Sequence, residues 1–232
     1  MTQEQIYQNI ARRTGGDIYI GVVGPVRTGK STFIKRFSEL LLLPHIQNEA
    51  QRARANDELP QSAAGRTIMT TEPKFIPEKA VNIELSGGGS FRARLIDCVG
   101  YMVDGALGHE EQDAPRLVKS PWFDHEVPFD LAAETGTRRV IREHATVGVV
   151  VTTDGSVADL PRENYCEAER RIIAELEAIG KPYVILLNCT DPDSDAAHQL
   201  AANLQDTYQR AVVPITCVAM TAQALDGILK TH

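Results

Sequence analysis

The hydrophobic residues of this chain are gathered into compact runs that alternate with longer amphipathic segments. Four runs are apolar on both faces, which is typical of strands buried within a parallel sheet. They cover residues 18–23, 146–153, 183–189 and 212–218. The segments that follow or precede these runs predict four longer helices. They cover residues 31–43, 129–144, 163–179 and 194–210. Alternation of this kind predicts a mostly parallel sheet that is covered by helices.

Two further runs predict a β-hairpin. Residues 81–85 and 91–99 are strand-like, and the glycine-rich segment 86–90 joins them. A hairpin within an otherwise alternating pattern places one antiparallel strand at the edge of the sheet. We therefore predict an α/β fold with a mostly parallel six-stranded sheet, one antiparallel edge strand and helices on both faces.

The remaining segments complete one predicted domain over residues 1–232. They are a short helix within 1–16, a polar helix over 47–58, a turn-rich stretch over 59–77 and a last helix starting within 221–232. Segment 100–128 has no clear period and is too long for a plain connection, so we expect an inserted loop or lid. It is either a switch that responds to a ligand or a covering flap packed by Trp122. Because the chain stops early in its last helix, we expect it to be a piece of a longer protein.

Composition narrows the class of protein. Of 232 residues, 43% are hydrophobic and 24% are charged, which are ordinary globular values. The net charge of −7 and the pI of 5.4 argue against broad binding to nucleic acid or anionic lipid. The four cysteines lack C-x-x-C spacing, so we expect neither a zinc cage nor a disulfide framework. With no signal peptide and no apolar run of membrane-spanning length, a reduced cytoplasmic protein is expected.

The segment after the first strand matches the phosphate-loop pattern G-x-x-x-x-G-K-[ST]. Its residues are Gly24, Pro25, Val26, Arg27, Thr28, Gly29, Lys30 and Ser31. Glycines let backbone amides turn inward around phosphate oxygens, and the helix that follows points its positive N-terminus at the same anion. Lys30 is predicted to reach the β and γ phosphates, and the Ser31 hydroxyl to ligate Mg²⁺.

Three other positions predict the rest of the metal and γ-phosphate site. Asp97 lies near the end of an apolar strand, where a carboxylate can hold Mg²⁺ through water. Gly100 follows three residues later and can offer its amide to the γ-phosphate. Thr70 and Thr71 lie in the turn-rich stretch, and a threonine hydroxyl from such a loop can complete the Mg²⁺ shell while a γ-phosphate is present. Their spacing does not decide which of the two ligates the metal.

Two arginines are candidates for stabilising the transferring phosphoryl group. Arg27 lies in the phosphate loop, and Arg66 lies in the stretch expected to close over a nucleotide. The residue after Gly100 is Tyr101, whereas many signalling GTPases place there a Gln that orients water. Water must therefore be positioned by another group, and slow turnover is expected.

The base-reading position leaves adenine and guanine open. After the fifth strand the sequence reads Asn188, Cys189, Thr190 and Asp191. Guanine readers use Asn-Lys-x-Asp, in which the Asp accepts two guanine N–H groups. Here Asp191 is present and Cys189 replaces the Lys. The alternative for Asp191 is a role at the start of the next helix.

Longer strings resemble the stage IV sporulation protein A family over essentially the whole chain. The strings lie at residues 15–19, 26–33, 57–65, 69–75, 97–101 and 152–155. The resemblance implies a fold like that of translation-factor GTPases combined with ATP hydrolysis. By motif, the Walker A lysine falls on Lys30, the Walker B acid on Asp97 and the sensor threonines on Thr70 and Thr71. Thr32, within the second string, joins the expected nucleotide-binding residues with Asn188.

Membership in that family would imply a role in assembly. Its members are morphogenetic proteins of endospore-forming bacteria, in which ATP hydrolysis drives a conformational change and irreversible polymerisation. The polymer forms the basement layer of the spore coat on the forespore surface, in the mother-cell cytoplasm. The partners implied are ATP with Mg²⁺, further copies of the chain, a small amphipathic membrane-anchoring peptide and other coat proteins. Family members are considerably longer than this chain, which looks like the N-terminal ATPase domain alone.

Two rival functions stay open beside ATP hydrolysis. The first is a GTPase that reads guanine through Asp191. The second is a scaffold that binds nucleotide with negligible turnover, which the missing Gln favours and the complete metal set disfavours.

Overall fold

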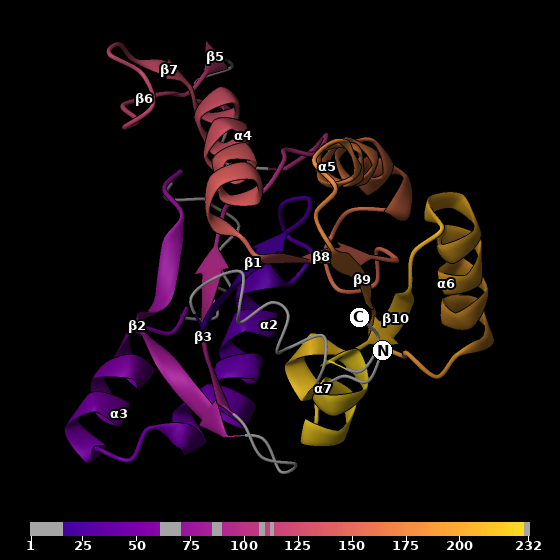
Figure 1. Ribbon diagram of the computed structural model, residues 1–232. Helices are drawn as coiled ribbons and strands as arrows, with labels where there is room; N and C mark the ends of the chain where they lie inside the picture. Colours follow the sequence, from indigo (N-terminus) through magenta and orange to yellow (C-terminus); the bar gives the residue numbers. More distant parts are fainter. Residues whose placement is uncertain (1–15, 61–70, 85–89, 107–109, 112–113, 230–232) are drawn as a thin grey trace.

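A computed structural model describes residues 16–60, 71–84, 90–106, 110–111 and 114–229. Figure 1 shows a central sheet with helices packed around it. The strands of that sheet are β1 (Asp17–Val23), β2 (Lys74–Glu84), β3 (Ser90–Asp97), β8 (Val147–Thr153), β9 (Tyr183–Asn188) and β10 (Val212–Ile215). The helices are α2 (Lys30–Phe37), α3 (Glu49–Asp57), α4 (Phe129–Arg139), α5 (Cys166–Ala178), α6 (Asp195–Tyr208) and α7 (Ala222–Leu229). The helix expected within 1–16 lies outside the described residues.

The sheet has six strands in the order β10-β9-β8-β1-β3-β2. Only the β2–β3 pair is antiparallel, and β2 lies at the edge, so the predicted architecture is confirmed. The interior strands β8 and β9 are buried along their whole length, as strands covered on both faces must be. The chain moves from β1 to β3 on one side and then to β8 on the other. Ligands of open α/β sheets bind at such a switch point, beyond the carboxyl ends of the strands.

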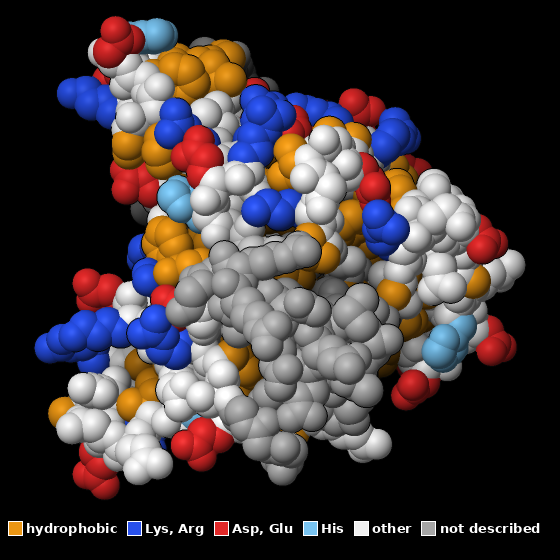
Figure 2. Space-filling model, viewed as in Figure 1, with side chains coloured by type: hydrophobic (Ala, Val, Ile, Leu, Met, Phe, Trp, Pro, Cys, Tyr) orange, Lys and Arg blue, Asp and Glu red, His pale blue; other side chains and the backbone are white. Residues whose placement is uncertain are grey.

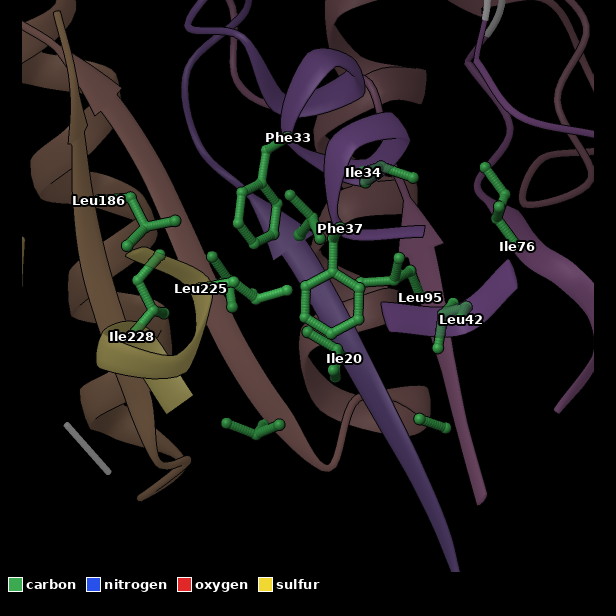
Figure 3. Close-up of a cluster of buried hydrophobic side chains, with 14 of the residues drawn as sticks. Ile20, Phe33, Ile34, Phe37, Leu42, Ile76, Leu95, Leu186, Leu225 and Ile228 are labelled. Atoms are coloured by element: carbon green, nitrogen blue, oxygen red, sulfur yellow. The ribbon is translucent and has the colours of Figure 1, made fainter. Parts of the chain in front are cut away.

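Helices cover both faces of the sheet. On one face, α2 and α7 pack against β1, β3 and β9. Figure 3 shows this cluster, in which Phe33 and Phe37 of α2 lie among aliphatic side chains from the strands and from α7. On the other face, α5, α6 and the π-helix η3 (Val140–His144), which follows α4, pack against the opposite side of β8 and β9. These two cores hold the carboxyl edge of the sheet in place.

Several element boundaries differ from the sequence prediction. The helix predicted over 129–144 is α4 followed by a π-helix, and the strand predicted over 91–99 is β3, which ends at Asp97. The helix predicted over 31–43 is α2 followed by the π-helix η1 (Ser38–Leu42) and the 3-10 helix η2 (Leu43–His45), which contains Pro44, a residue without a donor for further helix. The last strand, predicted to reach residue 218, ends at Ile215, and the 3-10 helix η5 (Cys217–Ala219) follows. Strand β2 begins at Lys74 rather than at 81, because it pairs with β3 in two stretches with a register shift between Ile76 and Val81.

Segment 100–128 contains two small strand pairs instead of a plain loop. They are β4 (Glu110–Glu111) with β5 (Ala114–Pro115), and β6 (Leu117–Val118) with β7 (Val127–Pro128). In Figure 1 the small strands β5, β6 and β7 lie beyond the N-terminal end of α4. The Arg139 guanidinium of α4 lies over the Trp122 ring at 4.8 Å from its centroid. The indole therefore packs on α4, as the flap alternative expects, and a response to nucleotide stays a prediction.

The surface has mixed charge. Figure 2 shows Lys and Arg side chains interspersed with Asp and Glu on the visible face, so neither sign dominates its coloured part. Across the described part of the chain, none of the helices has the length and hydrophobicity that crossing a bilayer requires.

Candidate functional site

The phosphate loop connects the carboxyl end of β1 to α2. Gly24 has φ 144°, and a Cβ there would lie 2.2 Å from the Val151 carbonyl oxygen, so only glycine fits this start of the loop. Within the loop, the buried Thr28 hydroxyl donates to the Pro25 carbonyl at 3.1 Å. No side chain caps the first turn of α2, which leaves its leading amides for another acceptor. Thr32 lies half-buried in that turn.

Lys30 is the first residue of α2 and its side chain is buried. Its Nζ donates to the Pro25 carbonyl at 2.6 Å and to the Gly24 carbonyl at 3.4 Å. Burial lowers the pKa of Lys30 from its ordinary value, while the nearby Asp97 carboxylate acts in the opposite direction. The loop thus holds a cation in a largely dry position, where an anion would interact strongly with it.

Ser31 and Asp97 meet at the edge of the sheet. Asp97 ends β3 beside Val22 of β1, and its Oδ2 accepts a hydrogen bond from Ser31 Oγ at 3.2 Å. Burial raises the pKa of Asp97, while Lys30 and then the Ser31 hydrogen bond lower it. One hydroxyl and one carboxylate suit Mg²⁺, which keeps several waters and takes phosphate oxygens as its other ligands. The described residues contain no group of three His, Cys, Asp or Glu for a metal held by protein side chains alone.

The segment after Asp97 lies against the phosphate loop. Tyr101 donates its amide to the Gly24 carbonyl at 3.3 Å, and its carbonyl accepts from the Val26 amide at 2.9 Å. Gly100 has φ 95°, and a Cβ there would lie 2.0 Å from the Gly24 oxygen and 2.8 Å from Lys30 Nζ. The Gly100 amide itself donates to the Thr137 hydroxyl at 3.2 Å. The predicted neighbours Gly24, Lys30 and Gly100 are therefore brought together.

Of the other candidates for phosphate chemistry, the structure describes Arg27 and Thr71. Arg27 has φ 62°, and its Nη2 is buried with no hydrogen-bond partner among the described residues. Arg27 also lies near Tyr165. Burial raises the pKa of the Tyr165 hydroxyl, and the positive charge of Arg27 lowers it. Thr71 is buried at the side of α4, close to Gly136. Arg66 and Thr70 lie outside the described residues, so their predicted roles stay predictions.

The predicted base-reading residues have different environments. Asn188 Nδ2 donates to the Thr28 carbonyl at 2.9 Å, and its Oδ1 accepts from the Cys217 amide at 3.0 Å. Its amide group therefore ties the phosphate loop to the segment after β10. Cys189 is buried, and burial raises the pKa of its thiol to about 11. Asp191 is exposed, accepts from the Asp193 amide at 3.3 Å, and precedes the Ser194 cap of α6.

Sequence reasoning did not find two residues that support the site. Thr137 lies in the last turn of α4, where no motif distinguishes it from other small helical residues. Ser156 accepts from the Thr190 amide at 2.9 Å and so joins the loops after β8 and β9. Its signal was the Thr152–Gly155 string directly before it, because polar loops at the carboxyl ends of neighbouring parallel strands meet.

The sheet order and the loop geometry define a P-loop nucleotide-binding protein. A solved structure of an SsGBP mutation variant has the same fold, with a TM-score of 0.50, 13% identity, and alignment over 95% of this chain and 56% of that one. Residues 1–232 match the family described as Stage IV sporulation protein A, ATPase domain. The chain belongs to that family.

Three relatives support the assignment, each named Stage IV sporulation protein A. The proteins from Bacillus anthracis and Bacillus subtilis (strain 168) are 52% and 50% identical to this chain over 230 residues, which is 99% of the chain. The protein from Clostridioides difficile (strain 630) is 48% identical over 97% of it. The chain spans about half the length of these relatives, 47% in the first two and 46% in the third.

Proposed function

We propose that this chain is a Mg²⁺-dependent ATP hydrolase whose turnover changes its conformation. The observation that carries the proposal is the convergence of the Lys30 ammonium, the Ser31–Asp97 pair and Gly100 at the carboxyl edge of β1 and β3. Membership in a family with an ATPase domain supports ATP as the substrate. The likeness to the solved structure supports the fold alone.

Each residue has a role that follows from its position. Bound Mg²⁺ supplies positive charge to the β and γ phosphates. Ser31 and Asp97 would hold this ion. The Lys30 ammonium binds the β and γ phosphates. Burial lowers the pKa of Lys30, and the negative charge of the phosphates raises it again. The amides of the loop and of the first turn of α2, with Thr28 and Thr32 beside them, bind the remaining phosphate oxygens.

Hydrolysis needs a water in line with the departing ADP. The water oxygen bonds to the γ-phosphorus as the bond to the bridging oxygen breaks. The bonding pair stays on ADP, the water proton ends on the inorganic phosphate, and both products leave. We assign γ-phosphate sensing to Gly100 with Thr70 and Thr71, and charge stabilisation to Arg66 and Arg27. Tyr101 is 1% exposed, so its side chain does not orient the water, and we expect slow turnover. Loss of phosphate then releases the sensing segments.

The assembly role is proposed for the full-length protein. ATP hydrolysis would drive polymerisation of a spore coat basement layer on the forespore surface, in the mother-cell cytoplasm. Because the chain spans about half of its relatives, contacts with further copies, with a membrane-anchoring peptide and with other coat proteins are assigned to the regions beyond it. We propose that residues 1–232 form the ATPase domain and that 100–128 is its inserted lid.

Phosphate release tests the proposal. We expect the wild type to release phosphate from ATP only with Mg²⁺, and Lys30→Ala and Asp97→Ala to lose at least about a hundredfold. Lys35→Ala is a matched control, because Lys35 is half-exposed and lies in the last turn of the same helix, away from the loop. Equal, near-zero release in all four proteins would refute hydrolysis and support the scaffold, which the burial of Tyr101 favours.

A GTPase is the second candidate. It is favoured by the exposed Asp191 carboxylate just beyond β9, where a base reader belongs. Competition of unlabelled ATP and GTP for one labelled ATP analogue decides between the two. We expect ATP to displace it at lower concentration, and the reverse order would overturn the ATP assignment.

A further inference from the structure

One turn of α4 contacts both segments to which γ-phosphate sensing is assigned. Thr137 is fully buried, and its Oγ1 accepts the hydrogen bond from the Gly100 amide at 3.2 Å. The residue before it, Gly136, faces the other segment, since a Cβ there would lie 3.1 Å from the Thr71 carbonyl oxygen. Two consecutive helical residues thus support segments that are far apart in sequence.

The hydrogen bond between Thr137 and Gly100 has a fixed direction. The single hydroxyl proton of Thr137 is donated to the Ala133 carbonyl at 2.9 Å, one turn earlier in α4. The oxygen lone pairs are therefore left to accept, and the Gly100 amide is the donor that reaches them. Because a backbone amide has one hydrogen, Gly100 cannot be fully bonded to Thr137 and to a phosphate oxygen at the same time.

We propose that Thr137 is a positioning residue that holds the Gly100 amide until a γ-phosphate takes its place. This inference rests on the proposed function, because it needs a γ-phosphate beside Gly100. Thr137 then lowers the free energy of the nucleotide-free and ADP states by satisfying a buried donor, and it leaves the ATP state unaffected. The hydroxyl therefore sets how strongly the chain distinguishes a triphosphate from a diphosphate. The contact between α4 and Gly100 therefore differs between the two states: the Thr137–Gly100 hydrogen bond is present with ADP and absent with ATP.

Thr137→Val tests the proposal, because valine keeps the shape and removes the hydroxyl. Dissociation constants for ADP and for a non-hydrolysable ATP analogue are measured with Mg²⁺ in the wild type, Thr137→Val and Thr137→Ser. We expect Thr137→Val to raise the preference for the ATP analogue over ADP about tenfold, equivalent to about 1.4 kcal/mol. Thr137→Ser keeps the hydroxyl and should behave as the wild type. A purely structural role would lower thermal stability without changing the ratio.

An unchanged ratio in a folded Thr137→Val protein, or an equal change in Thr137→Ser, overturns the inference while the proposed function stands. If the wild type binds neither nucleotide, both fail. Should Thr137→Val not fold, the amide NMR signal of Gly100 in the wild type decides the matter. We expect it to shift on adding the ATP analogue and to stay in place with ADP. A signal that responds to both ligands alike, or to neither of them once bound, overturns the proposal.

Discussion

The phosphate end and the base end of this site are built in different ways. At the phosphate end, Lys30, Ser31 and Asp97 are side chains that contact one another or the loop itself, and all three were predicted by motif. At the base end, Asn188 is engaged by two backbone groups and Cys189 is buried, so Asp191 is the exposed member of its motif. The first end has a defined chemistry, whereas the second does not single out a base.

The difference shows what a loop motif determines. Phosphate is bound mainly by backbone amides and a helix terminus, whose positions follow from the spacing of glycines and a lysine. A base is recognised by a few side-chain atoms on separate loops, and one replacement such as Cys189 removes the pattern. Substitutions at the two ends should therefore differ in both size and nucleotide dependence.

Gly100→Ala should have the largest effect. Its Cβ would lie 2.0 Å from the Gly24 oxygen, at a φ of 95° that side chains rarely adopt, so the loop must move. We expect a loss of about 3 kcal/mol in the free energy of unfolding and at least about a hundredfold in ATP hydrolysis. Chemical denaturation and phosphate release measure the two.

Gly180→Ala is the matched control for that substitution. Gly180 also has a positive φ, 63°, but a Cβ there would meet nothing within 4 Å. We expect a cost of about 1 kcal/mol and unchanged turnover. If both variants behaved alike, the crowding between Gly100 and Gly24 would have no role.

Asn188→Ala should have a smaller effect, and its effect on affinity should not depend on which base the nucleotide carries. It leaves the Thr28 carbonyl and the Cys217 amide without their partner, which should cost about 2 kcal/mol of stability. Because Asn188 reaches nucleotide through the phosphate loop, affinity for ATP and GTP should fall by the same factor, about tenfold. The exposed Asn203 on α6 provides the control Asn203→Ala. A loss confined to one nucleotide would show that Asn188 reads the base directly.

Asp191→Ala should change ATP binding less than about twofold, because an exposed carboxylate in a turn contributes little. Titration with ATP and with GTP, for the variant and the wild type, measures the effect. If the wild type bound GTP tightly and the variant did not, Asp191 would recognise guanine, and the ATP assignment would be contradicted.

The sequence predicted the strands and the phosphate loop because both depend on local patterns. Runs such as 147–153 are rich in valine, and Gly24 to Ser31 carry their geometry in eight consecutive residues. The early start of β2 was missed because its pairing to β3 depends on a distant strand across a register shift. The contacts of Thr137 with Gly100, 37 residues away, and of Asn188 with Thr28, 160 residues away, follow from tertiary packing that no spacing encodes.

The cysteines offer the smallest effect and a way to compare both ends in one protein. Burial raises the pKa of the thiol to about 12 at Cys98, near Lys30 of the phosphate loop, and at Cys217, and to about 11 at Cys189. Since thiol reagents attack the thiolate, the half-exposed Cys166 should be labelled first. Labelling of the other three should rise about tenfold per pH unit between pH 7 and 9, because their thiolate fraction keeps growing below the pKa.

An ATP analogue should slow the labelling of Cys98, which lies between Asp97 and Gly100, about threefold by limiting access of the reagent to this thiol. Cys189 and Cys217 should respond less, because the base end gains fewer contacts. Mass spectrometry of labelled peptides resolves the four sites. A Cys98 labelling rate that levels off near pH 9 would show that its thiol is in contact with water. If the nucleotide protected Cys189 more strongly than Cys98, the base end would be the part that nucleotide stabilises most, and the comparison would be reversed.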